Sequence, residues 1–309
     1  MKKLNVLVNM MNHNPIGQKS LEDVVGIFGH QLRALGHKII WETSNQSFLR
    51  AEDGINLIVE GFTPSSTAVI TAAKAQGCRF IMLATEEPTE KGFNHGTQPE
   101  MVLRQKMFAE AAKSFEAIFY LVPGEYTHRW YNQFAPAAYV ELGYAPSLVR
   151  QQKVEPDFEF GFYGSLTKRR LNILKKLAKL TNVTNAIKVV ADFKDQVDRD
   201  NQMMRAKVIV QLRKFDAMGL VSSSRCNTAL CLGRPIVAEP HDLSKPWDEV
   251  VQFTDSMEHF YNACMMARIN WKSMHHAQMT KFKDKFPPEL CVGRPFELVG
   301  LTGAERVAA

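Results

Sequence analysis

Short, uniformly hydrophobic runs alternate along this chain with longer segments whose hydrophobic residues recur at helical spacing. The first run, residues 4–10, precedes a helical pattern with Ser20 as the expected N-cap and Gly36 as the expected end. Hydrophobic strands that are each followed by a helix indicate a parallel sheet covered on both faces. The same pattern predicts strands at 38–42, 55–62, 79–85 and 117–122 and helices at 64–77, 99–115 and 123–134.

The alternation stops at residues 143–158, which are polar, contain two prolines and lack periodicity. We interpret this segment as an interdomain linker. The pattern then restarts, with strands predicted at 158–165, 186–192, 207–212 and 235–239, helices at 167–180, 195–206 and 224–232, and a helical tail from Asp255 onward. The sequence therefore predicts an α/β fold of two tandem Rossmann-like, doubly wound domains, residues 1–145 and residues 158–309, the second ending in the helical tail.

Composition narrows the functional classes. A length of 309 residues suits two domains, and a formal net charge of +6 fits phosphorylated or acidic ligands without indicating nucleic acid. The five cysteines form no CxxC pair, so neither a zinc site nor a disulfide framework is indicated. We find no signal-peptide pattern and no transmembrane run. A cytoplasmic protein is expected, and peripheral membrane contact stays open.

The stretch VSSSRCNTALCLGRPIVAEP, residues 221–240, contains a candidate anion site. Three serines precede a predicted helix, whose N-terminus offers free N–H groups. Arg225 falls in the first helical turn, where a positive charge opposes the helix dipole unless an anion is bound. Ordinary helix caps account for Ser224 and Gly233 but not for Arg225. We therefore predict that Ser224 and Arg225 bind an anion.

A second candidate site is FYGSLTKRR, residues 162–170. Gly164 ends a predicted strand and lets the backbone approach a ligand closely. Ser165 offers a hydroxyl group, and Arg169 and Arg170 fall in the first turn of the next helix, where bound phosphate would offset their unfavourable position. The alternative interpretation is a solvated basic helix face.

The stretch at residues 221–240 resembles the C-terminal donor-site motif of GT-B glycosyltransferases, especially family-1-like and CgeB-like members. These enzymes have a Ser-Arg-x-x-Glu-Ala-Leu-x-x-Gly-x-Pro-Val pattern. FGFYGSLTKRR is similar to the strand–turn–helix that opens the same domain. The resemblance extends over nearly the whole chain, and it implies a nucleotide-sugar donor. Its diphosphate would be held by Ser165, Arg169 or Arg170, and Arg225.

One position departs from the family pattern. Thr228 stands where these enzymes usually have Glu, often a ligand of the donor ribose. The resemblance still places Thr228 in the donor site. Asn227 and Glu239 are the candidates for the missing polar contact.

The N-terminal domain contains a candidate catalytic loop at residues 9–17, NMMNHNPIG. In a doubly wound domain this loop lies at the ligand-binding edge, and Gly17 would permit close approach. His13 titrates near neutral pH, and the resemblance makes it a candidate general base. A solvent-exposed loop histidine is the alternative interpretation.

Two adjacent carboxylates, Glu86 and Glu87, follow the strand at 79–85 and could accept a proton from a sugar hydroxyl. Successive side chains leaving a strand point in opposite directions, so one of the two faces the site. We prefer Glu87 as the candidate catalytic residue. A solvated acidic turn is the alternative.

Together the motifs and the resemblance imply a metal-independent glycosyltransferase with no cofactor beyond its nucleotide-sugar co-substrate. The acceptor would be a glycan, a lipid-linked group or a protein, and no nucleic acid is expected. Asp198-Arg199-Asp200 matches a metal-binding DxD motif but lies in a predicted helix, so we interpret it as a solvated face. The alternatives are another two-domain sugar-phosphate enzyme, such as an epimerase, and a degenerate GT-B binding or scaffold subunit. An inverting and a retaining outcome both stay open.

Overall fold

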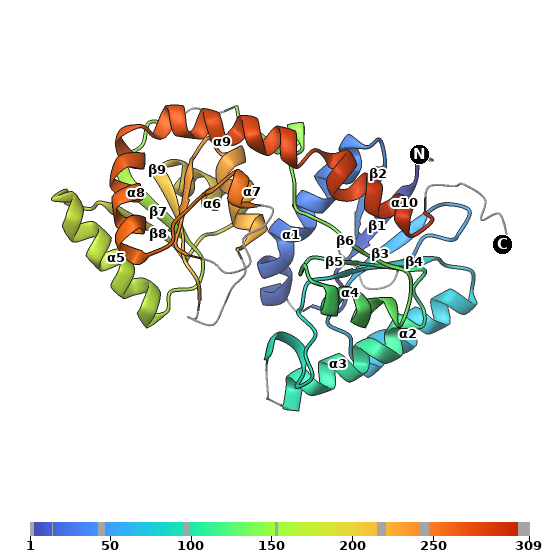
Figure 1. Ribbon diagram of the computed structural model, residues 1–309. Coiled ribbons are helices and arrows are strands. Elements are labelled where there is room, and N and C mark those ends of the chain that lie inside the picture. The colour runs from blue at the N-terminus through green and yellow to red at the C-terminus, as the bar shows by residue number, and fades with distance from the viewer. Residues whose placement is uncertain are drawn as a thin grey trace. The chain divides into compact units, whose positions relative to one another are not determined.

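Hydrophobic strands form two parallel sheets in the computed structural model, which describes residues 3–13, 15–42, 47–95, 99–151, 154–214, 221–240 and 247–301 (Figure 1). The chain divides into two units, Met1–Leu142 with Pro288–Ala309, and Gly143–Pro287. Each unit contains one of the sheets together with its helices. Two doubly wound α/β domains were predicted, and this architecture is confirmed.

The first unit contains a six-stranded sheet in the order β2-β1-β3-β4-β5-β6, with every neighbouring pair parallel. Its strands are β1 (Asn5–Asn9), β2 (Lys38–Glu42), β3 (Ile55–Val59), β4 (Phe80–Ala84), β5 (Ala117–Tyr120) and β6 (Ala137–Tyr139). Its helices are α1 (Pro15–Ala34), α2 (Pro64–Ala75), α3 (Pro99–Ala112), α4 (Glu125–Asn132) and α10 (Arg294–Leu298), with a short 3-10 helix η1 (Phe93–His95) and a π-helix η4 (Glu289–Gly293). Strand β6 was not predicted, because Ala-Ala-Tyr is too short to give a periodic signal.

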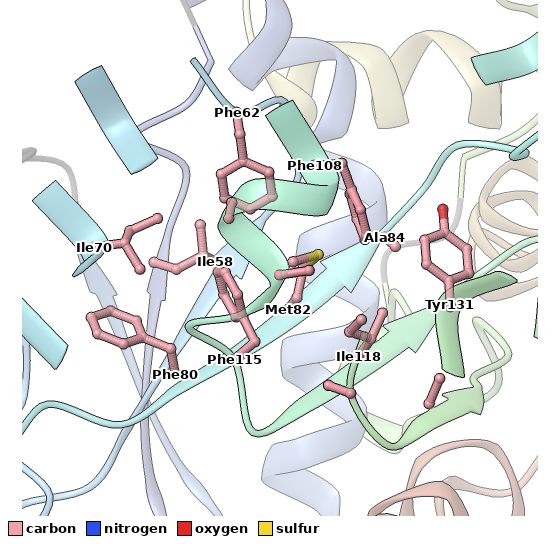
Figure 2. Packing of buried hydrophobic residues seen from close by; sticks show 14 of the residues in the cluster. Ile58, Phe62, Ile70, Phe80, Met82, Ala84, Phe108, Phe115, Ile118 and Tyr131 are labelled. Carbon is pink, nitrogen blue, oxygen red and sulfur yellow. The ribbon is translucent and has the colours of Figure 1, made fainter. Parts of the chain in front are cut away.

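The core of this unit lies on its central strands. Every residue of β3, β4 and β5 is buried, as expected of strands covered on both faces. Figure 2 shows Ile58 and Met82 from this sheet together with Phe108, Phe115 and Tyr131 from the segments that cover it. None of these three strands contains a charged side chain, and the buried amide of Asn56 in β3 is hydrogen-bonded to the backbone of Leu49 and Arg79.

Helix α1 starts earlier than the sequence pattern suggested. It begins at Pro15, so Ser20 lies inside the helix and is not its N-cap. Proline suits a first helical turn because N–H groups there have no intrahelical acceptor, so the N–H that proline lacks costs no hydrogen bond. Gly17 consequently belongs to the first turn of α1 and not to the loop after β1. The predicted end is confirmed, because Gly36 adopts a φ of 88° just beyond the last turn.

The second unit contains a five-stranded sheet in the order β11-β10-β9-β7-β8, again with parallel pairs. Its strands are β7 (Phe158–Tyr163), β8 (Ile187–Val190), β9 (Ala206–Gln211), β10 (Ile236–Ala238) and β11 (Gln252–Phe253). Its helices are α5 (Lys168–Thr181), α6 (Gln196–Met204), α7 (Ser223–Cys231), α8 (Met257–Ile269) and α9 (Trp271–Lys285), with short turns η2 (Pro146–Leu148) and η3 (Trp247–Glu249). In both units the strand order reverses between the first strand and the third, which marks the usual ligand-binding point of such sheets.

The end of the chain belongs to the first unit, whereas the sequence-based boundary assigned all of residues 158–309 to the second domain. The aromatic ring of Phe296 explains the difference. It is fully buried and stacks on Phe119 of β5, with ring centroids 4.5 Å apart, and it also lies 6.4 Å from the ring of Phe28. The helical pattern of the tail did not reveal which sheet it would cover.

Replacing Phe296 with alanine is expected to destabilise the first unit by about 3–5 kcal/mol, because the change leaves a cavity beside Phe119. Leu298→Ala is the matched control, since Leu298 lies in the same helix but is 72% exposed. Urea unfolding of both variants measures the difference. Equal stability of the two variants would contradict the assignment of the tail to this core.

Candidate functional site

Arg225 lies at the reversal point of the second sheet, between the ends of β7 and β9. Gly164 follows β7 with a φ of 132°, and a Cβ atom there would come within 3.4 Å of the Arg225 Cζ atom. Arg225 Nη1 also donates to Oε1 of Gln211, the last residue of β9, at 3.3 Å. The backbone conformation therefore favours glycine at position 164, and the guanidinium of Arg225 packs against it.

The charge of Arg225 has no carboxylate partner among the described residues. Its hydrogen bond goes to the neutral amide of Gln211, and burial lowers the pKa of the guanidinium. The N-terminus of α7 lies beside it, and the N-cap residue, Ser222, makes no side-chain capping bond. The hydroxyl groups of Ser222 and Ser224 instead lie 3.3 Å apart. A cation, hydroxyl groups and helical N–H groups thus meet where an anion would be stabilised.

Arg170 connects the loops that follow β7 and β9. Its side chain is 1% exposed and donates to the carbonyl oxygens of Ser165 at 2.8 Å, Leu212 at 2.7 Å and Arg213 at 3.1 Å. Burial and the neighbouring charge of Arg225 lower its pKa to about 10. Arg170 also donates to the hydroxyl oxygen of Ser165 at 3.3 Å. The structure therefore gives Arg170 a positioning role and leaves Ser165 exposed at the strand end.

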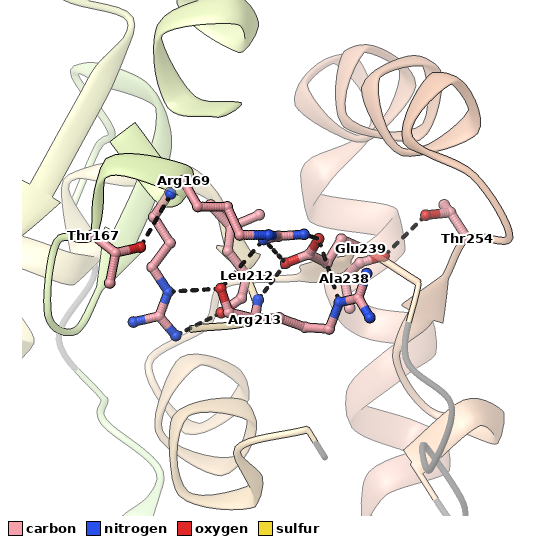
Figure 3. A network of polar contacts seen from close by, with 8 residues as sticks. Thr167, Arg169, Leu212, Arg213, Ala238, Glu239 and Thr254 are labelled. Atoms are coloured by element: carbon pink, nitrogen blue, oxygen red, sulfur yellow. Dashed lines mark hydrogen bonds and ion pairs between the residues drawn. The ribbon is translucent and has the colours of Figure 1, made fainter. Parts of the chain in front are cut away.

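Arg169 forms an ion pair with Glu239, which follows β10 (Figure 3). The two guanidinium nitrogens lie 2.9 and 2.6 Å from the two carboxylate oxygens, and the backbone N–H of Arg213 donates to the same carboxylate. Glu239 is completely buried. The guanidiniums of Arg169 and Arg213 pair with this carboxylate, and the charge of Arg170 also interacts with it, so three cations share one buried anion.

Two further donor-site candidates lie on α7. Asn227 is fully buried and uses its amide internally: it donates to the Gly143 carbonyl and accepts from Cys231 Sγ at 3.4 Å. Thr228 is also buried. The structure thus gives Asn227 an internal structural role, and a ribose contact from Thr228 stays a prediction.

His13 lies at the corresponding point of the first sheet. The imidazole, from the loop after β1, packs against Gly61, which has a φ of 110°, and a Cβ there would lie 2.8 Å from His13 Cε1. Its side chain is hydrogen-bonded to the Glu60 backbone, and Nε2 has no partner. Burial and the positive charge of Arg104 lower the pKa of His13 below its usual 6.5. The imidazole is therefore neutral at pH 7, with a lone pair available at Nε2.

Two carboxyl groups follow β3 and β4 in the same unit. Glu60 is 1% exposed, and its Oε1 accepts from the Thr85 hydroxyl at 2.5 Å and from the Thr85 N–H. Burial, with the neighbouring charge of Glu86, raises the pKa of Glu60 to about 8. Glu86 Oε1 lies 2.7 Å from Nη2 of Arg104, yet burial still raises its pKa. A protonated acid and an ion pair therefore lie next to each other at neutral pH.

Of the two adjacent glutamates, Glu86 is the one buried against Arg104. Glu87 is partly exposed, and its backbone exchanges hydrogen bonds with Asn94. A catalytic role for Glu87 stays a prediction.

Sequence reasoning missed Glu60, although a glutamate that ends the hydrophobic run INLIV and precedes a glycine is an available signal. Arg104 lies within an ordinary helical pattern, and no signal distinguished it.

Buried polar atoms without hydrogen-bond partners concentrate in this part of the first unit. Half of the ten such side-chain atoms among the described residues belong to it: Asn9 Nδ2, Asn12 Oδ1, His13 Nε2, Glu60 Oε2 and Glu86 Oε2. Each unpaired buried polar group costs about 1–3 kcal/mol. Local violations of this kind are expected at functional sites, where stability is sacrificed for binding or chemistry. We define these five residues, with Arg104, as the first-unit cluster.

The DxD-like segment is not a metal site. It lies in α6, as the sequence pattern suggested. Asp200 is buried and forms ion pairs with Arg150 and Arg199, so the prediction that this segment is solvated is wrong for Asp200. Across the ranges that the structure describes, no group of three or more His, Cys, Asp or Glu side chains is arranged to hold a metal ion.

None of the helices described has the length and apolar character that crossing a membrane requires.

Comparison with known proteins identifies the fold. No protein-family model matches the sequence. No curated protein matches it either. A trehalose-6-phosphate synthase, OtsA, superposes with a TM-score of 0.57 at 8% identity, covering 96% of this chain and 99% of that one. The Anabaena protein HepE, solved with UDP and glucose, gives a TM-score of 0.53 at 12% identity with the same coverage of 96% and 99%. The predicted GT-B glycosyltransferase fold is confirmed.

Glu60→Gln is expected to make stability less dependent on pH. The folded protein keeps the Glu60 proton up to about pH 8, whereas an ordinary carboxyl loses it near 4.5. Between these values folding takes up a proton, so the free energy of unfolding decreases as pH rises, by at most about 1.4 kcal/mol per pH unit. The glutamine variant lacks this term and should gain stability over the wild type from pH 5.5 to 8.

Urea unfolding at several pH values measures this difference, with Glu87→Gln as the control for loss of a nearby carboxyl group. A constant stability difference between Glu60→Gln and the wild type across the range would show that Glu60 is ionised in the folded state.

Proposed function

We propose that this protein is a metal-independent glycosyltransferase. It would move a sugar from a nucleotide-sugar donor bound to the second unit onto a hydroxyl group of a glycan, a lipid-linked group or a protein. The observation that carries the proposal is the Arg225 guanidinium, which has no carboxylate partner among the described residues and lies against Gly164 beside the N-terminus of α7. The GT-B fold shared with HepE, which was solved with UDP and glucose, supports a nucleotide sugar as the ligand.

The donor diphosphate would bind at Arg225, with the N–H groups of α7 and the Ser165 and Ser224 hydroxyls as further donors. Arg170 would hold the two loops in place, since three of its contacts are backbone carbonyls. Cleavage of the bond between the sugar and the diphosphate increases the negative charge on the phosphates. Fixed guanidiniums stabilise that charge without reorganisation, so a metal ion is not needed for the leaving group.

His13 would act as the general base. Its neutral imidazole presents an unpaired Nε2, which would take the acceptor hydroxyl proton as that oxygen forms the new bond to the sugar. The electron pair of the broken bond leaves with the diphosphate. This describes an inverting reaction, and a retaining enzyme would not need His13 as a base.

A binding or scaffold subunit is the second candidate. Thr228 favours it, because a buried threonine replaces the family glutamate and cannot supply a carboxylate to a ribose. Incubation with a panel of nucleotide sugars separates the two candidates. Slow hydrolysis without an acceptor supports a transferase, whereas tight nucleotide binding without any turnover supports a binding subunit.

Arg225→Ala is expected to weaken binding of the preferred nucleoside diphosphate at least about tenfold, since a charge-assisted hydrogen bond contributes about 1.5–3 kcal/mol. Calorimetry with UDP, GDP and dTDP first identifies the preferred nucleoside diphosphate and then measures the affinity of the variant for it. Lys168→Ala is the matched control, because it removes one exposed positive charge from the first turn of α5. Equal affinities of the two variants would remove the basis of the donor-site assignment.

His13→Ala is expected to lower turnover at least about a hundredfold while nucleotide affinity stays unchanged, because a general base contributes about 10²–10⁴-fold. In the wild type, activity should rise with pH through the His13 pKa, which lies below 6.5, and should already be near its plateau at pH 7. Rates measured from pH 5 to 8 test both points. Near-normal turnover of the variant on the true acceptor would favour a retaining mechanism.

A further inference from the structure

The unpaired atoms of the first-unit cluster are mostly hydrogen-bond acceptors. Asn12 Oδ1 and His13 Nε2 accept in their neutral forms, and the carboxyl oxygen Oε2 of Glu86 accepts when ionised. Asn9 Nδ2 is a donor, and Glu60 Oε2 donates while the acid holds its proton. Because Asn9 and Glu60 are each 1% exposed, solvent does not satisfy these groups. A partner for the cluster must therefore donate to several atoms and accept from others.

The charges of the cluster restrict that partner further. Arg104 is paired with Glu86, so the ionised groups of the cluster balance. Burial raises the pKa of Glu60 to about 8, and His13 is neutral at pH 7 because burial and Arg104 lower its pKa. An ammonium group would only donate and a phosphate dianion would only accept, and either would add a buried charge that no group of the cluster balances, because Arg104 and Glu86 neutralise each other. A neutral hydroxyl group both donates and accepts.

The groups also lie at the reversal point of the first sheet. Asn9 ends β1, Glu60 follows β3, and Glu86 follows β4 by one intervening residue. Doubly wound sheets bind their ligands at this edge. The unpaired atoms are shielded from solvent, whereas the side chains of Asn12, His13 and Arg104 are partly exposed, so a ligand would approach the cluster from the side of these residues.

We propose that the first-unit cluster is a binding site for a neutral sugar ring with adjacent hydroxyl groups. Two neighbouring hydroxyl groups supply donors for Asn12 and Glu86 and an acceptor for Asn9, and they introduce no net charge between Arg104 and Glu86. This inference rests on the proposed function in one respect: it identifies the sugar as the acceptor, or as the acceptor's terminal residue. The binding site itself does not depend on catalysis.

The test is direct binding of small ligands to the full chain, measured by saturation-transfer NMR. The neutral probes are the methyl glycosides of glucose, galactose, mannose, xylose and N-acetylglucosamine. The charged probes are glucuronate, glucosamine and glucose 6-phosphate. We expect at least one neutral glycoside to bind more tightly than every charged probe. The proposal is overturned if no neutral glycoside binds or if a charged probe binds best.

Three variants locate the binding. Glu86→Gln and Asn12→Ala should each weaken glycoside binding at least about fivefold, the loss expected for one or two hydrogen bonds, while Glu90→Gln, which changes an exposed carboxyl group outside the cluster, should leave it unchanged. Urea unfolding of each variant shows that it remains folded. Glycoside binding that is equal in Glu86→Gln, Asn12→Ala and the wild type would place the sugar elsewhere and overturn the proposal.

Arg225→Ala separates this inference from the proposed function. It should weaken nucleotide binding at least about tenfold and keep glycoside binding, since Arg225 belongs to the other unit. A protein that binds the glycoside but no nucleotide would refute the transferase and leave the sugar site standing. A protein that binds nucleotide at Arg225 but no neutral glycoside would refute the sugar site alone.

Discussion

Burial of the parallel sheets constrains where each unit can hold a polar group. Strands β3, β4 and β5 are buried at every position, so charged side chains are excluded from these strands. They collect at the carboxyl ends instead, where the reversal of strand order separates neighbouring loops. Both units use a glycine with positive φ at this point, Gly61 and Gly164, against which a ring or a guanidinium packs. The chemistry of both sites follows from this common arrangement.

Arg169 and Arg225 illustrate how far sequence reasoning extends. Each lies in the first turn of a helix that follows a serine-containing loop, and the pattern assigned both to phosphate binding. The structure separates them, because Glu239, seventy residues from Arg169, neutralises that side chain and leaves Arg225 with the neutral Gln211. The position of both arginines in a first helical turn could be predicted from local spacing. The pairing of Arg169 with Glu239 could not be predicted, because the two residues lie far apart in the sequence.

The fold itself was largely predictable, because buried parallel strands and capped helices have strong local signals. Thr167 illustrates this, since it begins α5 as a side-chain cap where the sequence pattern starts that helix. The errors have physical causes. Pro15 extends α1 backward over Gly17, and the tail carries a helical pattern whose partner, Phe119, lies far away in the sequence. Glu60 escaped notice because a single carboxyl group in a hydrophobic run has no periodicity.

The return of the tail to the first sheet also has a consequence for the order of folding. The second unit, Gly143–Pro287, is continuous in sequence, whereas the first is interrupted by it. During synthesis from the N-terminus, every residue of the second unit is added to the chain before Phe296. The first unit therefore lacks the Phe296 ring that stacks on Phe119 until all residues of the second unit have been synthesised. The interrupted unit is completed last, although its synthesis begins first.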